Sequence, residues 1–282
     1  MITARFAPSP TGLLHLGHAY SAAVGHSLAR EAGGRFRLRI EDLDRGRSRP
    51  EFVNSLFEDL RWLGLNWDGE PLVQSKRAPA YAEALEALRG EGLVYPCFCT
   101  RSDIAEVLAA PHGRGGAHYP GTCRGFADDP ERRRAEPHSW RLNAGAAIER
   151  TGLPGWTEED GTRLDSARAD FDDIILARRD APAAYHLACV IDDAASGVTL
   201  VTRGADLRPS TPVQRLLQNL LGLPEPAYCH HPLIGHADGR RLAKRDQAPT
   251  LAAMRAGGVD GQALATALAA GQLPLGFAFI GD

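Results

Sequence analysis

The chain has 282 residues, with 32 lysines and arginines against 35 acidic residues, so its formal net charge is −3. This balance excludes nucleic-acid binding driven by an overall positive charge. A nucleic acid could bind only through local basic patches. With 44% hydrophobic and 24% charged residues and no apolar run near ~18 residues, the composition predicts a globular protein without a membrane span. We expect it to be cytoplasmic, because the N-terminus lacks the basic and apolar regions of a signal peptide.

A turn rich in proline and glycine separates the first predicted strand from the first predicted helix. Residues 2–6 suit a short strand, which the two following prolines end because they have no N–H, and residues 16–32 have helical periodicity. We therefore expect His15, Gly17 and His18 at a helix N-terminus, where free N–H groups bind anions such as phosphate. The alternative is a proline-rich turn followed by a helix with ordinary histidines.

Strand-like and helix-like segments alternate through the first ~90 residues, which predicts parallel βαβ units. Residues 35–40 look like a strand, and residues 50–63 look like a helix. A segment rich in glycine, proline and charge follows, and the regular pattern resumes at about residue 170. The predicted fold is α/β, a doubly wound parallel sheet with an inserted subdomain and a short helical C-terminal segment over residues 251–272.

The sequence pattern predicts four parts of the chain. Residues 1–94 form the first half of the sheet domain and residues 95–190 form the inserted subdomain. Residues 191–235 form the second half of the sheet domain, and residues 236–282 hold a basic loop and the short helical tail.

The basic loop "GRRLAKR", residues 239–245, holds one of the two lysines among the 32 basic residues of the chain. Lys244 therefore stands out, because a lysine ammonium is a compact and mobile charge that can follow a phosphate. Together with the phosphate-binding helix start, this loop suits one ATP molecule between them. The alternative is a basic surface cluster.

Charged residues gather where predicted strands end. Glu41 follows the second strand, while Arg5 and Arg203 lie at the ends of two others. Ligands of an open α/β sheet bind at this edge, where the arginines can hold carboxylates and the acid can hold an ammonium group. The set suits an amino acid with two carboxylates, although each residue alone would more often belong to a structural ion pair.

Five cysteines in a cytoplasmic chain favour metal ligands or free thiols over a disulfide framework. Cys97, Cys99 and Cys123 lie in the inserted segment, where three thiolates and one further ligand make a structural zinc site. On chemical grounds a histidine is the commoner fourth ligand, and both His112 and His118 are near.

Several ordered motifs resemble a known family. "PSPTGLLHLGH" resembles the HIGH motif of class I aminoacyl-tRNA synthetases, and "RLAKR" resembles their KMSKS loop. "RFAPSPTG", "RIEDLD" and "RGADL" look like the glutamyl branch of that class. The resemblance implies a Rossmann-type core that makes glutamyl-adenylate from L-glutamate and ATP with Mg²⁺. The loop departs from the motif, because Arg241 replaces its first lysine and Ala243 and Arg245 replace its serines, while Lys244 retains the second lysine.

The resemblance also implies roles for single residues. His15 and His18 hold ATP and act in catalysis with Lys244, which stabilises the leaving pyrophosphate, and Gly17 belongs to the same ATP site. The implied glutamate pocket consists of Arg5, Phe6, Ala7, Pro8, Ser9, Glu41, Tyr185 and Arg203. The short relatives carry a Cys-x-Cys and Tyr-x₃-Cys arrangement that matches Cys97, Cys99, Tyr119 and Cys123. This match points to Tyr119 as the fourth ligand of one structural Zn²⁺ per chain.

The length of the chain bears on the acceptor. Only 37 residues follow Arg245, whereas ordinary glutamyl-tRNA synthetases continue there into helical anticodon-binding domains. The short relatives without such a domain, the glutamyl-queuosine tRNA(Asp) synthetases, attach glutamate to the queuosine base in the anticodon loop of tRNA(Asp). The resemblance to these enzymes implies the same activity for this chain. It also implies a monomer in which the inserted subdomain contacts the acceptor RNA.

Two alternatives stay open. One is a truncated synthetase that charges the 3′ end of tRNA(Glu). The other is a non-catalytic relic of the fold that binds RNA or an amino acid, and intact His15, His18 and Lys244 argue against it.

Overall fold

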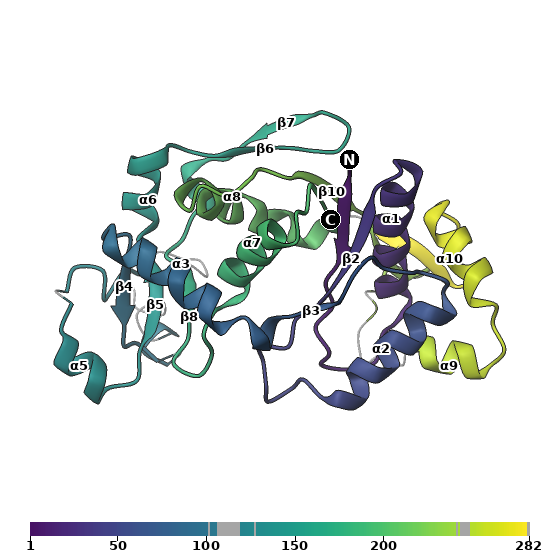
Figure 1. Ribbon diagram of the computed structural model, residues 1–282, viewed down its shortest axis with the longest axis horizontal. Helices are drawn as coiled ribbons and strands as arrows, with labels where there is room; N and C mark the ends of the chain where they lie inside the picture. The colour runs from purple at the N-terminus through teal and green to yellow at the C-terminus, as the bar shows by residue number, and fades with distance from the viewer. Residues whose placement is uncertain (101, 106–118, 127, 241, 243–248, 281–282) are drawn as a thin grey trace.

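The computed structural model describes residues 1–100, 102–105, 119–126, 128–240, 242 and 249–280 (Figure 1). Several residues singled out in the sequence lie outside these ranges, namely His112, His118, Arg241, Ala243, Lys244 and Arg245. Among the helices that the structure does describe, none combines the length and the apolar character needed to cross a membrane.

The core of the molecule is a parallel sheet in two parts that lie edge to edge. The first part has the order β1-β2-β3, and the second pairs β9 with β10. The two parts meet at β1 and β9, where the Thr199 N–H donates to the Thr3 carbonyl over 2.9 Å. The strands run over Thr3–Phe6 (β1), Arg35–Ile40 (β2), Leu72–Val73 (β3), Leu200–Gly204 (β9) and Ala227–His231 (β10). The predicted doubly wound α/β fold is confirmed.

The two faces of the sheet are chemically different because successive strand residues point to opposite sides. Phe36, Leu38 and Ile40 of β2 pack with helix α1 in one apolar core. Arg5 of β1 and Arg39 of β2 alternate with those residues and are buried on the sheet without joining that core. The helices of the first half run over Leu16–Glu31 (α1), Pro50–Trp62 (α2) and Ala78–Gly90 (α3), with a 3₁₀ turn at Gln74–Lys76 (η1).

The inserted segment is more regular than its glycine and proline content predicts. An antiparallel sheet with the order β4-β5-β8 stands at one side of the molecule, and a hairpin of β6 and β7 extends from it (Figure 1). Its elements are β4 (Val94–Cys97), α5 (Pro130–Ala135), β5 (Ser139–Leu142), α6 (Ala144–Thr151), β6 (Gly155–Thr157), β7 (Arg163–Asp165), η2 (Arg168–Asp170) and β8 (Ile175–Ala177).

Two helices join the insertion to the sheet. Helices α7 (Tyr185–Ala195) and α8 (Thr211–Leu220) pack in a second apolar core with α3, β5 and β8, and the 3₁₀ turn η3 (Ala205–Ser210) precedes α8. Helix α7 therefore crosses the boundary expected between residues 190 and 191. Its apolar face binds it to the insertion, while its acidic end reaches the sheet.

The helical tail expected over residues 251–272 is divided in two and followed by a strand. Helix α9 (Leu251–Ala256) ends before Gly258, whose φ of +79° is a left-handed conformation that favours glycine, and α10 (Gly261–Ala269) follows. Strand β12 (Phe277–Ile280) then pairs antiparallel with β11 (Leu233–His236), which spans the boundary expected at residue 235. The tail is thus packed against the first half, with α10 against α1.

Candidate active site

A cavity of about 580 Å³ lies at the carboxyl ends of β1 and β9. It gathers all the described residues that the sequence assigned to ATP or glutamate, which are Arg5, Phe6, Ala7, Pro8, Ser9, His15, Gly17, His18, Glu41, Tyr185 and Arg203. Lys244 lies outside the described residues, but Leu242, two positions before it, lines the same cavity. The two motifs at opposite ends of the chain therefore approach one space.

The start of α1 holds the two histidines in a defined chemical form. His15 is the N-cap, and its Nδ1 accepts from the Gly17 N–H over 3.2 Å. The His15 N–H in turn donates to His18 Nδ1 over 3.2 Å. A neutral imidazole that accepts at Nδ1 carries its hydrogen on Nε2, so both rings are Nε2–H donors.

Gly17 is needed at this turn for space rather than for backbone conformation. A Cβ at this position would lie 3.1 Å from His15 Cε1 and 3.2 Å from its Nδ1, closer than most side chains allow. The glycine therefore lets the His15 ring fold back onto the helix start.

A buried ion network lies beneath the cavity. Asp193 of α7 accepts at one oxygen from Arg5 Nε, over 3.1 Å, and from Arg39 NH1. Arg39 also donates to Glu41 Oε1 over 3.0 Å. Burial alone raises the pKa of Asp193, but the two guanidiniums hold that pKa below its ordinary value, so the carboxylate stays ionised.

Arg5 and Glu41 thus line the cavity and are also paired within the protein. The described contacts of the Glu41 carboxylate involve Oε1, which leaves Oε2 for an ammonium group in the cavity. Arg5 NH1 donates to the Thr202 carbonyl over 2.8 Å, which ties the end of β1 to β9.

Arg203 has a different environment. Its side chain is buried and meets neutral groups on all three nitrogens, while no described ion pair includes it. A buried guanidinium without a carboxylate partner suits an anionic ligand. Of the predicted glutamate residues, Arg203 has the clearest chemistry for a substrate carboxylate.

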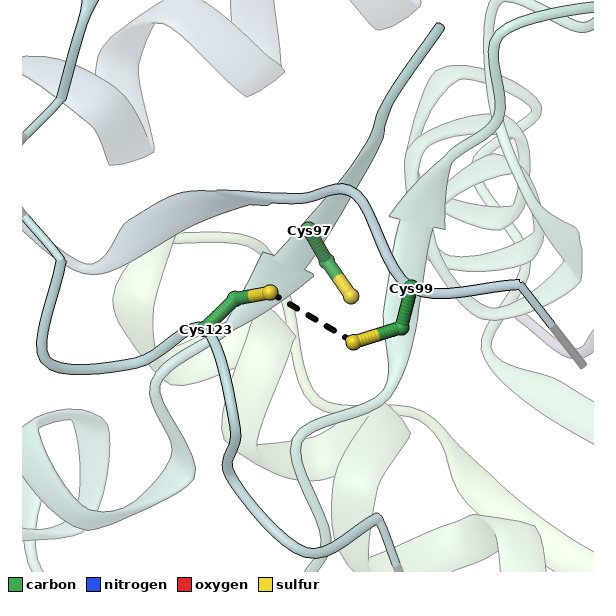
Figure 2. Close-up of side chains that lie close together, drawn as sticks. All are labelled: Cys97, Cys99 and Cys123. Carbon is green, nitrogen blue, oxygen red and sulfur yellow. Dashed lines mark hydrogen bonds between the residues drawn. The ribbon is translucent and has the colours of Figure 1, made fainter. Parts of the chain in front are cut away.

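The three cysteines of the insertion form a second cluster. Cys97 ends β4, and Figure 2 shows its side chain, that of Cys99 and that of Cys123 pointing toward one another. Their sulfurs lie within 4.8 Å of one another, and those of Cys99 and Cys123 are 3.5 Å apart. Thiolates at about 2.3 Å from a tetrahedral zinc lie about 3.8 Å apart, so the donor set fits that ion.

Tyr119 completes this cluster among the described residues. Its hydroxyl lies 3.3 Å from the Cys97 sulfur and 3.7 Å from the Cys99 sulfur, and it accepts from the Cys123 N–H over 3.0 Å. The guanidinium of Arg141 lies 3.8 Å from the centre of the Tyr119 ring. The hydroxyl therefore faces the space between the thiols, where a fourth ligand would lie.

Sequence reasoning missed the residues that hold the site together. Asp193 and Arg39 were not singled out, although an arginine that alternates with buried apolar residues in β2 and an acid in an apolar helix are both signals of a buried ion pair. His230, which contacts Arg203, had no signal beyond its place in a strand.

The comparisons with known proteins agree with this geometry. The family model described as "tRNA synthetases class I (E and Q), catalytic domain" matches residues 1–273. The chain belongs to this family.

Curated relatives within the class I synthetases are similar along 82–96% of their own length. The Glutamyl-Q tRNA(Asp) synthetase of Rhodobacter capsulatus is 49% identical over 272 residues, which cover 92% of this chain and 96% of the relative. The Glutamyl-Q tRNA(Asp) synthetase of Nocardia farcinica is also 49% identical, over 93% of this chain and 82% of the relative.

A solved structure supports the same fold. The glutamate-tRNA synthetase of Elizabethkingia anophelis matches with a TM-score of 0.80 and 26% identity. The match covers 95% of this chain but 61% of that synthetase, so the chain spans less than two thirds of its length.

Asp193 forms ion pairs with both Arg5 and Arg39, and this arrangement leads to a prediction about the stability of this class I synthetase. Replacing Asp193→Asn removes the ion-pair partner of the buried Arg5 and leaves the buried Arg39 with Glu41 alone, and we expect a loss of about 3–5 kcal/mol in the free energy of unfolding at pH 7. Because the folded pKa of Asp193 is lowered, this stability is present above pH 4 and is lost as the pH falls through the folded pKa. Urea unfolding followed by circular dichroism at several pH values measures both the free energy of unfolding and its dependence on pH.

The matched control is Asp44→Asn, which removes an exposed carboxylate that pairs with Arg47. We expect no measurable change from it, because surface ion pairs contribute little. Equal unfolding curves for Asp193→Asn and the wild type at pH 7 would contradict the assigned role of Asp193.

Proposed function

We propose that the chain activates L-glutamate with ATP and transfers it to the queuosine base in the anticodon loop of tRNA(Asp). The observation that carries the first step is the single cavity that contains both the α1 N-terminus and the buried Arg203. For the second step, the support is the name Glutamyl-Q tRNA(Asp) synthetase, which relatives 42–49% identical to the chain carry.

The first step needs positioned charges rather than a protein nucleophile. A glutamate carboxylate oxygen attacks the α-phosphorus of ATP, a new P–O bond forms, and the bond to pyrophosphate breaks. His15 and His18 donate from Nε2 to phosphate oxygens at the helix N-terminus. Lys244 stabilises the charge on pyrophosphate as it leaves, and Mg²⁺ accompanies the ATP phosphates.

The glutamate pocket uses charges of both signs. Arg203 binds a substrate carboxylate with two parallel N–H groups, and Glu41 receives the ammonium group. Arg5 and the backbone of residues 6–9 form one wall, and Tyr185 at the first turn of α7 forms the other. The Asp193 network holds Arg5 and Glu41 in place.

In the second step an oxygen of the acceptor attacks the carbonyl carbon of glutamyl-adenylate, an ester forms, and AMP leaves. The proposed acceptor is the queuosine base of tRNA(Asp). A second candidate is the 3′-terminal ribose of tRNA(Glu), which the similarity to a glutamate-tRNA synthetase favours.

We also propose that Cys97, Cys99, Tyr119 and Cys123 hold one structural zinc ion. The ion would supply order to a segment with few apolar side chains, which cannot build a core of its own. No catalytic step depends on it, because the cluster does not line the cavity of the active site.

Glutamate activation is expected without any tRNA. Incubation with ATP, Mg²⁺, glutamate and labelled pyrophosphate should form labelled ATP, and Lys244→Ala should reduce this exchange by about 100-fold through the loss of a phosphate contact. Arg203→Ala should lose saturation by glutamate while ATP binding persists, because its charge faces the substrate. Exchange that stays at background until tRNA is added would contradict tRNA-free activation.

The acceptor is identified by mapping the product. Labelled glutamate, transferred to purified tRNA(Asp) with and without queuosine, should be recovered in the nuclease fragment of the anticodon loop and only from the modified tRNA. Periodate is a poor probe here, since it oxidises the diol of queuosine as well as the terminal ribose. Label on the 3′-terminal adenosine of tRNA(Glu) would support the second candidate instead.

Zinc content is measured after expression in zinc-supplemented medium. We expect one zinc per chain, none in Cys99→Ser and a reduced amount in Tyr119→Phe, because the first change removes a thiolate and the second the hydroxyl that faces the thiols. Cys189→Ser is the matched control, since this cysteine lies outside the cluster. A supplemented wild type without metal would refute the site, and full retention in Tyr119→Phe would give the fourth position to a histidine or water.

A further inference from the structure

The guanidinium of Arg203 is held by three neutral groups. Its Nε donates to His230 Nε2 over 3.2 Å, its NH1 to Gln214 Oε1 over 2.6 Å and its NH2 to Thr211 Oγ1 over 2.7 Å. A guanidinium has five N–H groups, so one remains on NH1 and one on NH2. A carboxylate in the cavity needs both of these N–H groups for a bidentate contact. The orientation of the guanidinium plane therefore determines whether the carboxylate can bind.

His230 can accept from Arg203 only while its Nε2 carries no hydrogen. It lies directly opposite Arg203 in the β9–β10 register, and its side chain is fully buried. Burial, and then the charge of Arg203, lower the pKa of His230 to about 4, so the ring is neutral at pH 7. Its single N–H must therefore be at Nδ1.

Glu158 selects that form of the ring. The His230 Nδ1 lies 2.8 Å from Glu158 Oε1 and 3.1 Å from Oε2, and a carboxylate can only accept. Glu158 comes from the β6–β7 hairpin of the insertion, which reaches toward β10 in Figure 1.

The position of Glu158 is itself defined by two contacts. Trp156 Nε1 donates to Glu158 Oε1 over 2.9 Å. The N–H of the next residue, Glu159, donates to the Tyr228 carbonyl of β10 over 2.8 Å. The carboxylate is thus held against the edge of the sheet, with its side chain 14% exposed.

We infer that Glu158 and His230 are positioning residues that orient Arg203 for the substrate carboxylate, so that the inserted hairpin helps to determine glutamate binding. The inference rests on the proposed function, in which Arg203 contacts glutamate. Neither residue lines the cavity, and both act through Arg203.

The test is pyrophosphate exchange with glutamate and ATP varied separately. His230→Ala removes the acceptor of Arg203 Nε, and we expect the KM for glutamate to rise about tenfold or more while the KM for ATP stays unchanged. His230→Gln restores most of the affinity, since its amide oxygen can accept near the position of Nε2.

Glu158→Ala raises the KM for glutamate severalfold, whereas Glu158→Gln, whose oxygen still accepts from Nδ1, has a smaller effect. Glu159→Ala removes the same charge from the same turn and leaves both KM values unchanged.

A double-variant comparison separates positioning from general damage. In the Arg203→Ala background, adding His230→Ala should cause no further loss in kcat/KM for glutamate, because the two residues act as one unit. A further loss equal to that in the wild-type background would overturn the inference, as would equal rises in both KM values. If His230→Ala fails to fold by circular dichroism, the Glu158 variants decide on the same criteria. Wild-type protein without glutamate-dependent exchange would refute the proposed function, whereas normal exchange with an unchanged glutamate KM in the folded variants refutes only this inference.

Discussion

One carboxylate oxygen, Oδ1 of Asp193, joins the two halves of the molecule. It accepts from Arg5 of β1 and Arg39 of β2, and all three side chains are buried. Two guanidiniums on one face of a sheet would repel each other and resist burial, so α7 has to bring its carboxylate there for the sheet to close. The same helix begins at Tyr185, and its packing therefore also sets one wall of the cavity.

Histidines lie in the cavity at the start of α1 and behind Arg203 on β10, and the partner of Nδ1 gives them opposite roles. At the start of α1, backbone N–H groups donate to Nδ1 of His15 and His18, which makes Nε2 a donor suited to phosphate oxygens. On β10 the Glu158 carboxylate accepts at Nδ1 of His230, which makes Nε2 an acceptor suited to a guanidinium. In the proposed function, the same kind of side chain thus binds the phosphates of ATP directly and acts on the carboxylate of glutamate through Arg203.

Local patterns predicted what local forces determine. The spacing of apolar residues predicted β2 at residues 35–40 and α1 from residue 16, and the turn between strand and helix placed His15 and Gly17 at the cavity. The partners of those residues could not be predicted in the same way. Asp193 is 188 residues from Arg5 and Glu158 is 72 residues from His230, and no periodicity indicates which of many acids meets which base. The pairing of β12 with β11 was missed for the same reason, because it depends on where helices α9 and α10 place the C-terminal end of the chain.

The distance along the chain between Asp193 and its arginines has a consequence for synthesis of the protein. Arg39 precedes Asp193 by 154 residues. Ribosomes add about 5–20 residues each second, so Arg39 leaves the ribosome roughly 8–30 seconds before Asp193 does, and Arg5 leaves it earlier still. During that interval Arg5 lacks the carboxylate that pairs with it, Arg39 has only Glu41 as an ion-pair partner, and β1 also lacks its neighbour β9. The face of the sheet that carries Arg5 and Arg39 is therefore completed only after α7 has been made, whereas the opposite, apolar face can pack with α1, which precedes α7 in the chain.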